Sequence, residues 1–260
     1  MVYVQDIDGS PLMPTTRHGK VRRLLKSKKA TVVNLCPFTI RLLYDTTGYK
    51  QEITLGVDAG TKHVGLSATT KSKELYASEV ILRSDVVDLL STRKLKVSRG
   101  KSLRDAAVMG IMKWKLYEEL RSRYDNVSMT FGYITKYNRI KYGIEKSHIS
   151  DAFVISKNFN ALMLEYHYKV RLIRRHNRQI HKQKVLKGGV KKPNQSSFEV
   201  FGFRLFDRVM FEGNYYFIFG RRKSGSFNIR DIDGGNQRDI TYKKLKLLRC
   251  KRFMIQKETN

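Results

Sequence analysis

The stretch Glu52–Thr70, EITLGVDAGTKHVGLSATT, decides the fold of the central part of the chain. Apolar and β-branched residues lead to one carboxylate, Asp58, and glycines surround that acid. The pattern predicts a strand, a tight turn and a second strand. A third strand is predicted at ELYASEVIL, and the short turns AGTK and TKSK favour antiparallel pairing. Asp58 is therefore expected at the end of the first strand of a sheet.

The charge balance indicates the kind of partner. The 260 residues include 52 Lys and Arg against 23 Asp and Glu, a net charge of +29. Such an excess predicts a polyanionic partner, with nucleic acid favoured over an anionic membrane surface. No apolar run is long enough to span a membrane, and the N-terminus lacks a signal-peptide pattern, so we expect a cytoplasmic protein without a membrane partner. The two cysteines exclude a disulfide framework and a Cys-x-x-Cys zinc site.

Two segments without acidic residues are the strongest candidates for nucleic-acid binding. Arg17–Ala30 holds seven Lys and Arg with apolar residues at helical spacing, and Lys169–Lys192 holds ten. TKYNRIKYG interleaves tyrosines with cations, which suits base stacking, although an ordinary loop packed by tyrosines is equally compatible. GRRKSG either contacts nucleic acid or is simply exposed to solvent. The candidate binding residues are Arg17, Lys20, Arg22, Arg23, Lys26, Lys136, Tyr137, Arg139, Arg174, Arg175, Arg178, Arg221 and Arg222.

The rest of the chain predicts a mixed α+β protein. Helices are expected over residues 103–121 and Ser147–Tyr166, with a strand at Asn126–Ile134 between them. From Phe198 onward the pattern is all β and suggests a small barrel of the SH3 type. We expect four regions, with a small α/β unit first and a basic linker third: residues 1–50, 51–168, 169–197 and 198–260.

A second acid is predicted to join Asp58. In SHISDAF, His148 and Asp151 are three residues apart at the start of a helix and so share one face. Two carboxylates beside a histidine suit divalent-cation binding and proton transfer in phosphodiester hydrolysis. Asp58 and Asp151 are the candidate metal ligands, and all three residues are the candidate catalytic groups. Taken singly, each residue is better explained as a turn or helix-capping residue.

Several motifs resemble the IscB and IsrB proteins, which are transposon-encoded, RNA-guided relatives of the CRISPR effector nucleases. PLMPTTRHGKVRRLLKSKKATVVNLCPFTIRLLY resembles their N-terminal PLMP region. LGVDAGTKHVGLSA and TKYNRIKYGIEKSHISDAFVIS resemble their first and third RuvC motifs. The resemblance implies a PLMP domain, a RuvC-like domain of RNase H fold, and a C-terminal SH3-like barrel that contacts the target-adjacent motif and guide RNA. It also implies Mg²⁺, a structured guide RNA, target duplex DNA, a monomer within a ribonucleoprotein, and a prokaryotic, nucleoid-associated location.

The chain departs from that family pattern in two places. The family's middle acid is a glutamate at the end of a fourth strand, and no glutamate stands there; Glu79, Glu118 and Glu119 are weak substitutes. The HNH nuclease insert is also missing, and LSTRKLKVSRGKS reads like a junction across a deletion. We therefore expect an RNA-guided DNA-binding protein whose shortened RuvC site is weak or inactive as a nuclease. An active Mg²⁺-dependent nickase and an RNA-binding protein with a RuvC relic are the alternatives.

Overall fold

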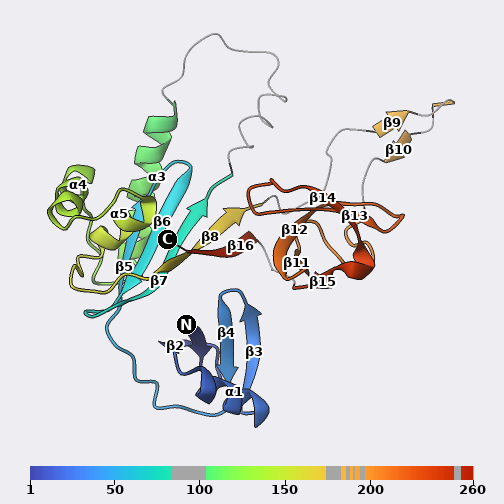
Figure 1. Ribbon diagram of the computed structural model, residues 1–260. Helices are drawn as coiled ribbons and strands as arrows, with labels where there is room; N and C mark the ends of the chain where they lie inside the picture. Colours follow the sequence, from blue (N-terminus) through green and yellow to red (C-terminus); the bar gives the residue numbers. More distant parts are fainter. Residues whose placement is uncertain are drawn as a thin grey trace. The chain divides into compact units, whose positions relative to one another are not determined.

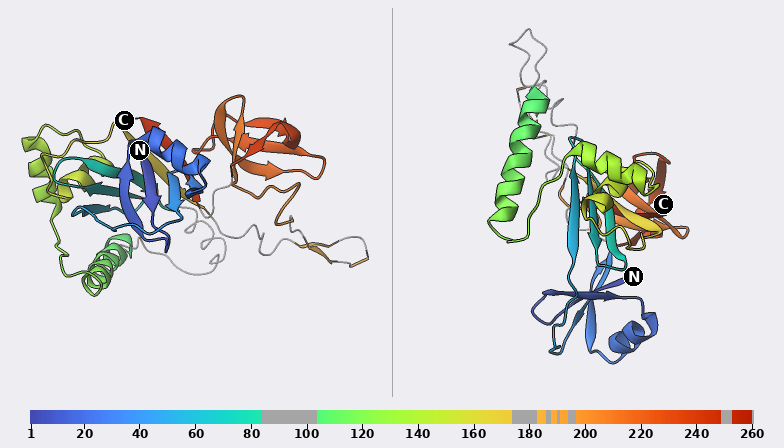
Figure 2. Two further views of the ribbon diagram at one scale, coloured as in Figure 1. Left: turned by 90° about the horizontal axis from the view of Figure 1, so that it is seen from below. Right: turned by 90° about the vertical axis from the view of Figure 1, so that its left-hand side faces the viewer.

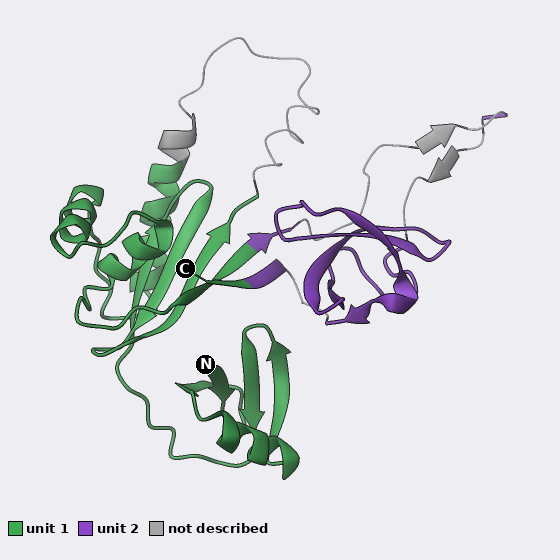
Figure 3. Cartoon of the chain, viewed as in Figure 1, with its two compact units in different colours: residues 1–170, 257–260 green, residues 171–256 purple. Residues whose placement is uncertain are grey.

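The chain folds as a mixed α+β protein with several sheets and few helices, as the sequence predicts (Figure 1). It divides into two compact units, residues 1–170 with 257–260 and residues 171–256 (Figure 3). None of the helices in the described parts is long and apolar enough to cross a membrane. The computed structural model describes residues 1–83, 104–173, 183–185, 188–189, 191–193, 197–248 and 253–259.

The N-terminal part of the first unit is a four-stranded sheet with one helix. The sheet has the order β2-β1-β4-β3, with β1 parallel to β4 and the other pairs antiparallel. Val21 on the helix is buried against Val2, Ile40 and Leu42 of the strands, because apolar residues recur at helical spacing among the cations. The PLMP stretch is extended, as expected. The elements are β1 Val2–Gln5, β2 Pro11–Thr15, α1 His18–Lys26, β3 Ala30–Leu35 and β4 Phe38–Leu42.

The central sheet has five strands in the order β16-β8-β7-β6-β5. Its strands β5, β6 and β7 form the antiparallel meander predicted from the alternation of apolar residues and short turns. β5, the strand that carries Asp58, lies at one edge of the sheet. The five strands are β5 Thr54–Ala59, β6 His63–Thr69, β7 Glu74–Ile81, β8 Tyr166–Leu172 and β16 Phe253–Thr259.

Helix α5, His148–Ile155, packs directly on β5 and β6 because two glycines remove the side chains between them. A Cβ built on Gly65 would lie 1.8 Å from the His148 carbonyl oxygen, and one on Gly56 would lie 1.9 Å from that of Ala152. At the far end of the helix, the Thr69 hydroxyl donates to Ser156 Oγ at 3.0 Å. Contacts at both ends therefore determine how the helix lies on the sheet.

Two predicted elements differ from the structure. The helix predicted over Ser147–Tyr166 ends at Ile155, where the Ser156 hydroxyl donates to the Phe153 carbonyl and Lys157 takes a left-handed φ of +62°. The strand predicted at Asn126–Ile134 is wrong: these residues are irregular up to Phe131, and helix α4 then covers Gly132–Lys141. A strand depends on cross-strand pairing, and among the described residues no strand pairs with this segment.

Helices α3 and α4 complete the first unit. α3, Arg104–Arg121, lies on the side of the central sheet away from α4 and α5 (Figure 2). Its apolar residues Ile111 and Trp114 are 68% and 55% exposed, so neither side chain is buried.

The second unit is built around a five-stranded antiparallel sheet in the order β14-β13-β12-β11-β15, with Phe217, Ile218, Phe227 and Ile229 fully buried. The strands are β11 Arg208–Phe211, β12 Asn214–Arg221, β13 Ser226–Arg230, β14 Arg238–Thr241 and β15 Lys246–Leu247, with a short 3₁₀ helix at Tyr242–Lys244. Among the described residues this sheet does not close into a barrel. The last strand, β16, instead joins the central sheet, and the short strands β9, Gln183–Val185, and β10, Lys191–Pro193, pair with each other.

Replacing Gly65 with alanine tests the close packing of α5. We expect Gly65→Ala to lower the free energy of unfolding by about 1–3 kcal/mol or more, because the new Cβ overlaps backbone that has no flexible end to move. Chemical denaturation measures this. Gly110→Ala in α3 is the matched control, since nothing lies within 4 Å of its added Cβ. Equal free energies of unfolding for the two variants would contradict the close contact between α5 and Gly65.

One acid is buried inside the central sheet and takes no part in the candidate site. Glu74 is 1% exposed, accepts from the Ser67 hydroxyl at 2.5 Å, and accepts from the Leu164 amide at 2.8 Å. Burial raises the pKa of this carboxyl, and the two hydrogen bonds only partly oppose the rise. Between its ordinary pKa of 4.5 and the raised value, the native state binds more protons than the unfolded state. The free energy of unfolding therefore falls as pH rises through that window.

We expect Glu74→Gln to remove the contribution of this carboxyl to the pH dependence, so that the free energy of unfolding of the variant falls less as pH rises above about 4.5 than that of the native chain. Denaturation across a pH series measures the slope. Glu52→Gln, at an exposed acid just before β5, is the control and should keep the native slope. If the free energy of unfolding of Glu74→Gln changed with pH as it does in the native chain, the pKa of Glu74 would not be raised.

Candidate functional site

Three side chains share one face of the central sheet at the end of β5. Asp58 pairs in register with Gly65 of β6, and Gly65 pairs with Glu79 of β7, so Asp58 and Glu79 lie on the same face. His63 is two residues from Gly65 and also lies on that face. This is the face that α5 covers.

The N-terminus of α5 supplies the other two candidate groups. Ser147 caps the helix by accepting a hydrogen bond from the Ser150 amide at 2.9 Å. His148 Nδ1 then lies 2.8 Å from Asp58 Oδ2, although 90 residues separate the two in the chain. Both side chains are partly exposed, at 43% and 29%, so solvent or a ligand can reach them. The sequence-predicted pair of Asp58 and His148 is therefore in direct contact.

Asp151 lies on the same helix but is paired with a cation. Arg139 Nε of α4 is 3.0 Å from Asp151 Oδ1, and the two side chains are only 13% and 22% exposed. The contact is an ion pair without an aligned hydrogen bond, because Arg139 Nε has no hydrogen-bond partner. Burial raises the pKa of Asp151, Arg139 opposes the rise, and the nearby charge of Asp58 adds to it.

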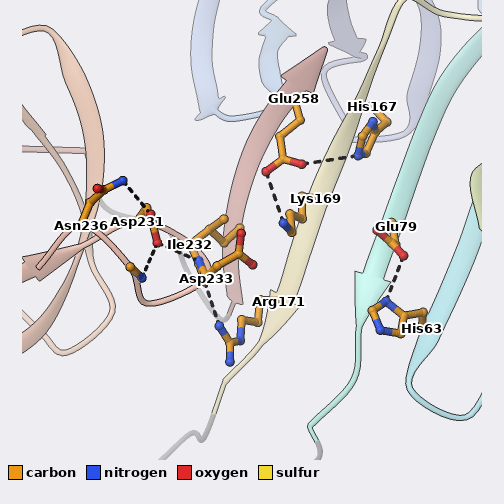
Figure 4. Close-up of polar contacts among 11 residues, drawn as sticks. His63, Glu79, His167, Lys169, Arg171, Asp231, Ile232, Asp233, Asn236 and Glu258 are labelled. Carbon is orange, nitrogen blue, oxygen red and sulfur yellow. Dashed lines mark hydrogen bonds and ion pairs between the residues drawn. The ribbon is translucent and has the colours of Figure 1, made fainter. Parts of the chain in front are cut away.

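A second histidine–carboxylate contact lies beside the first. His63 Nδ1 is 2.9 Å from Glu79 Oε1 across β6 and β7 (Figure 4). The imidazoles of His63 and His148 stack with ring centroids 5.2 Å apart and planes 3° from parallel. The sequence identified Glu79 only as a weak substitute and did not single out His63. The pairing of the three predicted strands could have identified both residues, because it places His63 and Glu79 on the same face of the sheet as Asp58.

These residues do not fit a pair of magnesium ions. Such a pair needs several free carboxylate oxygens. Asp58 is bonded to His148, Asp151 is paired with Arg139, and Glu79 is bonded to His63. Asp58, Asp151 and Glu79 are thus each already in contact with a side-chain nitrogen.

The family of the chain follows from its N-terminal half. The RRXRR protein family matches residues 2–132, just over half of the chain. The chain belongs to the RRXRR protein family. The match includes all of β1–β7, and with them Asp58, His63 and Glu79. No curated protein matches the sequence.

The cations predicted to bind nucleic acid lie in different environments in this RRXRR-family chain. The five on or next to α1 are all exposed, and no acid of the described residues lies within ion-pair distance of them. They are Arg17, Lys20, Arg22, Arg23 and Lys26. A helix face that is only exposed to solvent usually carries charges of both signs. A face with cations alone is suited to binding phosphates.

The remaining candidates divide into exposed and internally bonded groups. Lys136 is exposed and Tyr137 is 66% exposed, both on α4 rather than on a loop. Arg139 is bound to Asp151. Arg221 is partly buried and donates to the carbonyls of Ser197, Phe198 and Phe203, and burial lowers its pKa. Arg222 is 67% exposed, 3.4 Å from Asp239. Three others lie outside the described residues: Arg174, Arg175 and Arg178.

Removing the cation beside Asp151 tests the geometry of the site. We expect Arg139→Gln to raise the pKa of Asp151 further, because Arg139 is the group that opposes the effect of burial. Carboxyl ¹³C NMR titration measures this pKa. Lys136→Gln, one turn earlier on α4 and exposed, should leave the pKa of Asp151 unchanged. An unchanged pKa in Arg139→Gln would show that the ion pair does not form in solution.

Proposed function

We propose that the chain is an RNA-guided DNA-binding protein of the IscB/IsrB type whose nuclease site is weak or inactive. The RRXRR family is associated with IscB-type nucleases. Three antiparallel strands followed by α5 on the same face resemble the start of an RNase H-like, RuvC-type core. The observation that carries the proposal is the contact between Asp58 and His148, because it joins the first and third RuvC-like motifs.

The expectation of weak cleavage is supported by the charge partners of the acids. Asp58 lies on the edge strand β5, where a further strand would be needed to add another acid beside it. Among the described residues no such strand is present, and Asp151 is held by Arg139. A site of this kind has too few free carboxylate oxygens to hold two hard cations.

In this proposal different parts of the chain contact different parts of the nucleic acid. The N-terminal α/β unit is the PLMP domain, and the exposed cations of α1 contact phosphates of a structured guide RNA. Residues 51–168 are a shortened RuvC-like domain, and the basic residues 169–197 are a linker. The C-terminal sheet is an SH3-like domain that contacts the target-adjacent motif and RNA. Base pairing by the guide, rather than side chains, selects the target duplex DNA.

RNA binding by the full-length chain is the first test. We expect the cognate guide RNA to raise the melting temperature, since a ligand that binds only the native state stabilises it. The double variant Arg22→Gln/Arg23→Gln should weaken RNA binding and lower the salt slope by about 0.7–0.9 for each phosphate that is no longer neutralised. Lys71→Gln/Lys73→Gln, at two exposed cations of the turn between β6 and β7, is the matched control.

Binding and cleavage of duplex DNA, measured on the same complex with guide RNA, then distinguish the proposed function from an active nickase and from a plain RNA-binding protein. The complex with guide RNA should bind a matched duplex but cut it weakly or not at all in magnesium. Strong nicking that Asp58→Ala abolishes would contradict the inactive site. Binding of RNA without any guided binding of duplex DNA would instead identify a plain RNA-binding protein.

A further inference from the structure

We propose that His63, Glu79 and His148 bind a single divalent transition-metal ion such as Zn²⁺ on the face of the central sheet that α5 covers. This ion-binding site is a property of the chain itself. It does not depend on RNA or DNA binding, and it differs from the magnesium pair that the acids of this region do not fit.

The ligand atoms already lie together. One ligand atom from each of His63, Glu79 and His148 lies within 4.8 Å of the other two. His63 Nδ1 and Glu79 Oε1 are 2.9 Å apart. Ligands on a tetrahedral ion lie about 3.4 Å apart when the metal–ligand bonds are about 2.1 Å long. Rotation of the two imidazoles out of their parallel stack would bring the three atoms into a coordination shell.

Asp58 is placed to support the site from outside the ligand shell. Its Oδ2 is 2.8 Å from His148 Nδ1. A carboxylate that accepts from Nδ1–H fixes the tautomer and leaves Nε2 free to bind a metal. Histidine ligands of metals almost always have such a partner on the second nitrogen. The contact explains why a lone acid ends β5 without requiring Asp58 itself to be a ligand.

The backbone holds the ligands on rigid elements. His63 begins β6 and Glu79 lies within the neighbouring strand β7, so sheet pairing sets their separation. His148 is the first residue of α5, whose N-terminus is seated on Gly65. All three ligands are intermediate in burial, so an ion can reach them while part of its hydration shell is excluded.

The donor set favours a transition metal over a hard cation. Two imidazoles and one carboxylate suit Zn²⁺ and similar ions, whereas Mg²⁺ prefers oxygen ligands and its own water. Three protein ligands leave a fourth position open for a water molecule or a phosphate oxygen. Without a metal, the same residues would form only two separate hydrogen-bonded histidine–carboxylate pairs.

Metal titration of the full-length chain tests the proposal. With Zn²⁺ as the probe, calorimetry should show tight binding of one ion that His63→Ala or Glu79→Gln weakens strongly. Asp58→Asn should weaken it by about 10- to 100-fold, as is usual for a partner of a histidine ligand. Co²⁺ in place of Zn²⁺ should give the visible absorption of a four-coordinate site. Excess Mg²⁺ should not displace either ion.

His167→Ala is the matched control, because His167 lies on β8 of the same sheet with Nε2 3.7 Å from Glu258, outside the cluster (Figure 4). It should bind Zn²⁺ as the native chain does. Melting of each metal-free variant separates loss of ligands from loss of fold, and Glu79→Gln keeps the shape of the side chain. Native affinity in His63→Ala and Glu79→Gln, or equal weakening in His167→Ala, would overturn the proposal.

Discussion

The close contact between helix α5 and strands β5 and β6 is the constraint on which the candidate site depends. Backbone of the helix lies where side chains would otherwise stand, because Gly56 and Gly65 have none. This contact brings His148 from the helix to Asp58 on the sheet across 90 residues of sequence. The bond between Thr69 and Ser156 holds the other end of the helix. If the helix moved outward by the width of a methyl group, the histidine would leave its partners.

Charge is distributed differently inside the site and on the surface. Near the end of β5 each acid has a nitrogen partner: Asp58 has His148, Asp151 has Arg139 and Glu79 has His63. On α1 the exposed cations have no acidic partner among the described residues. Local compensation inside the site reduces the affinity of its acids for hard cations, while uncompensated cations on α1 attract a polyanion. The net charge of +29 is therefore relevant mainly to the surface.

The sequence predicted the elements whose own pattern is strong. The alternation and short turns of residues 52–82 indicated the three-stranded meander, and Ser147 indicated the start of α5. The end of α5 was missed because Ser156 and Lys157 stop the helix by hydrogen bonding and a left-handed backbone, which apolar periodicity does not report. The strand expected at Asn126–Ile134 has strand composition, but strand formation also depends on a partner elsewhere in the chain.

The sequence by itself determined that one acid ends the first strand, that a histidine and a second acid share the first turn of a later helix, and that cations are concentrated in acid-free segments. These properties depend on residues close together in the chain. Only the tertiary structure decided that Asp151 is paired with Arg139 and that Glu79 and His63 join His148 beside Asp58. The physical reason is that distances between side chains on different strands and helices depend on sheet register and on helix packing over the glycines, and neither can be read from local sequence.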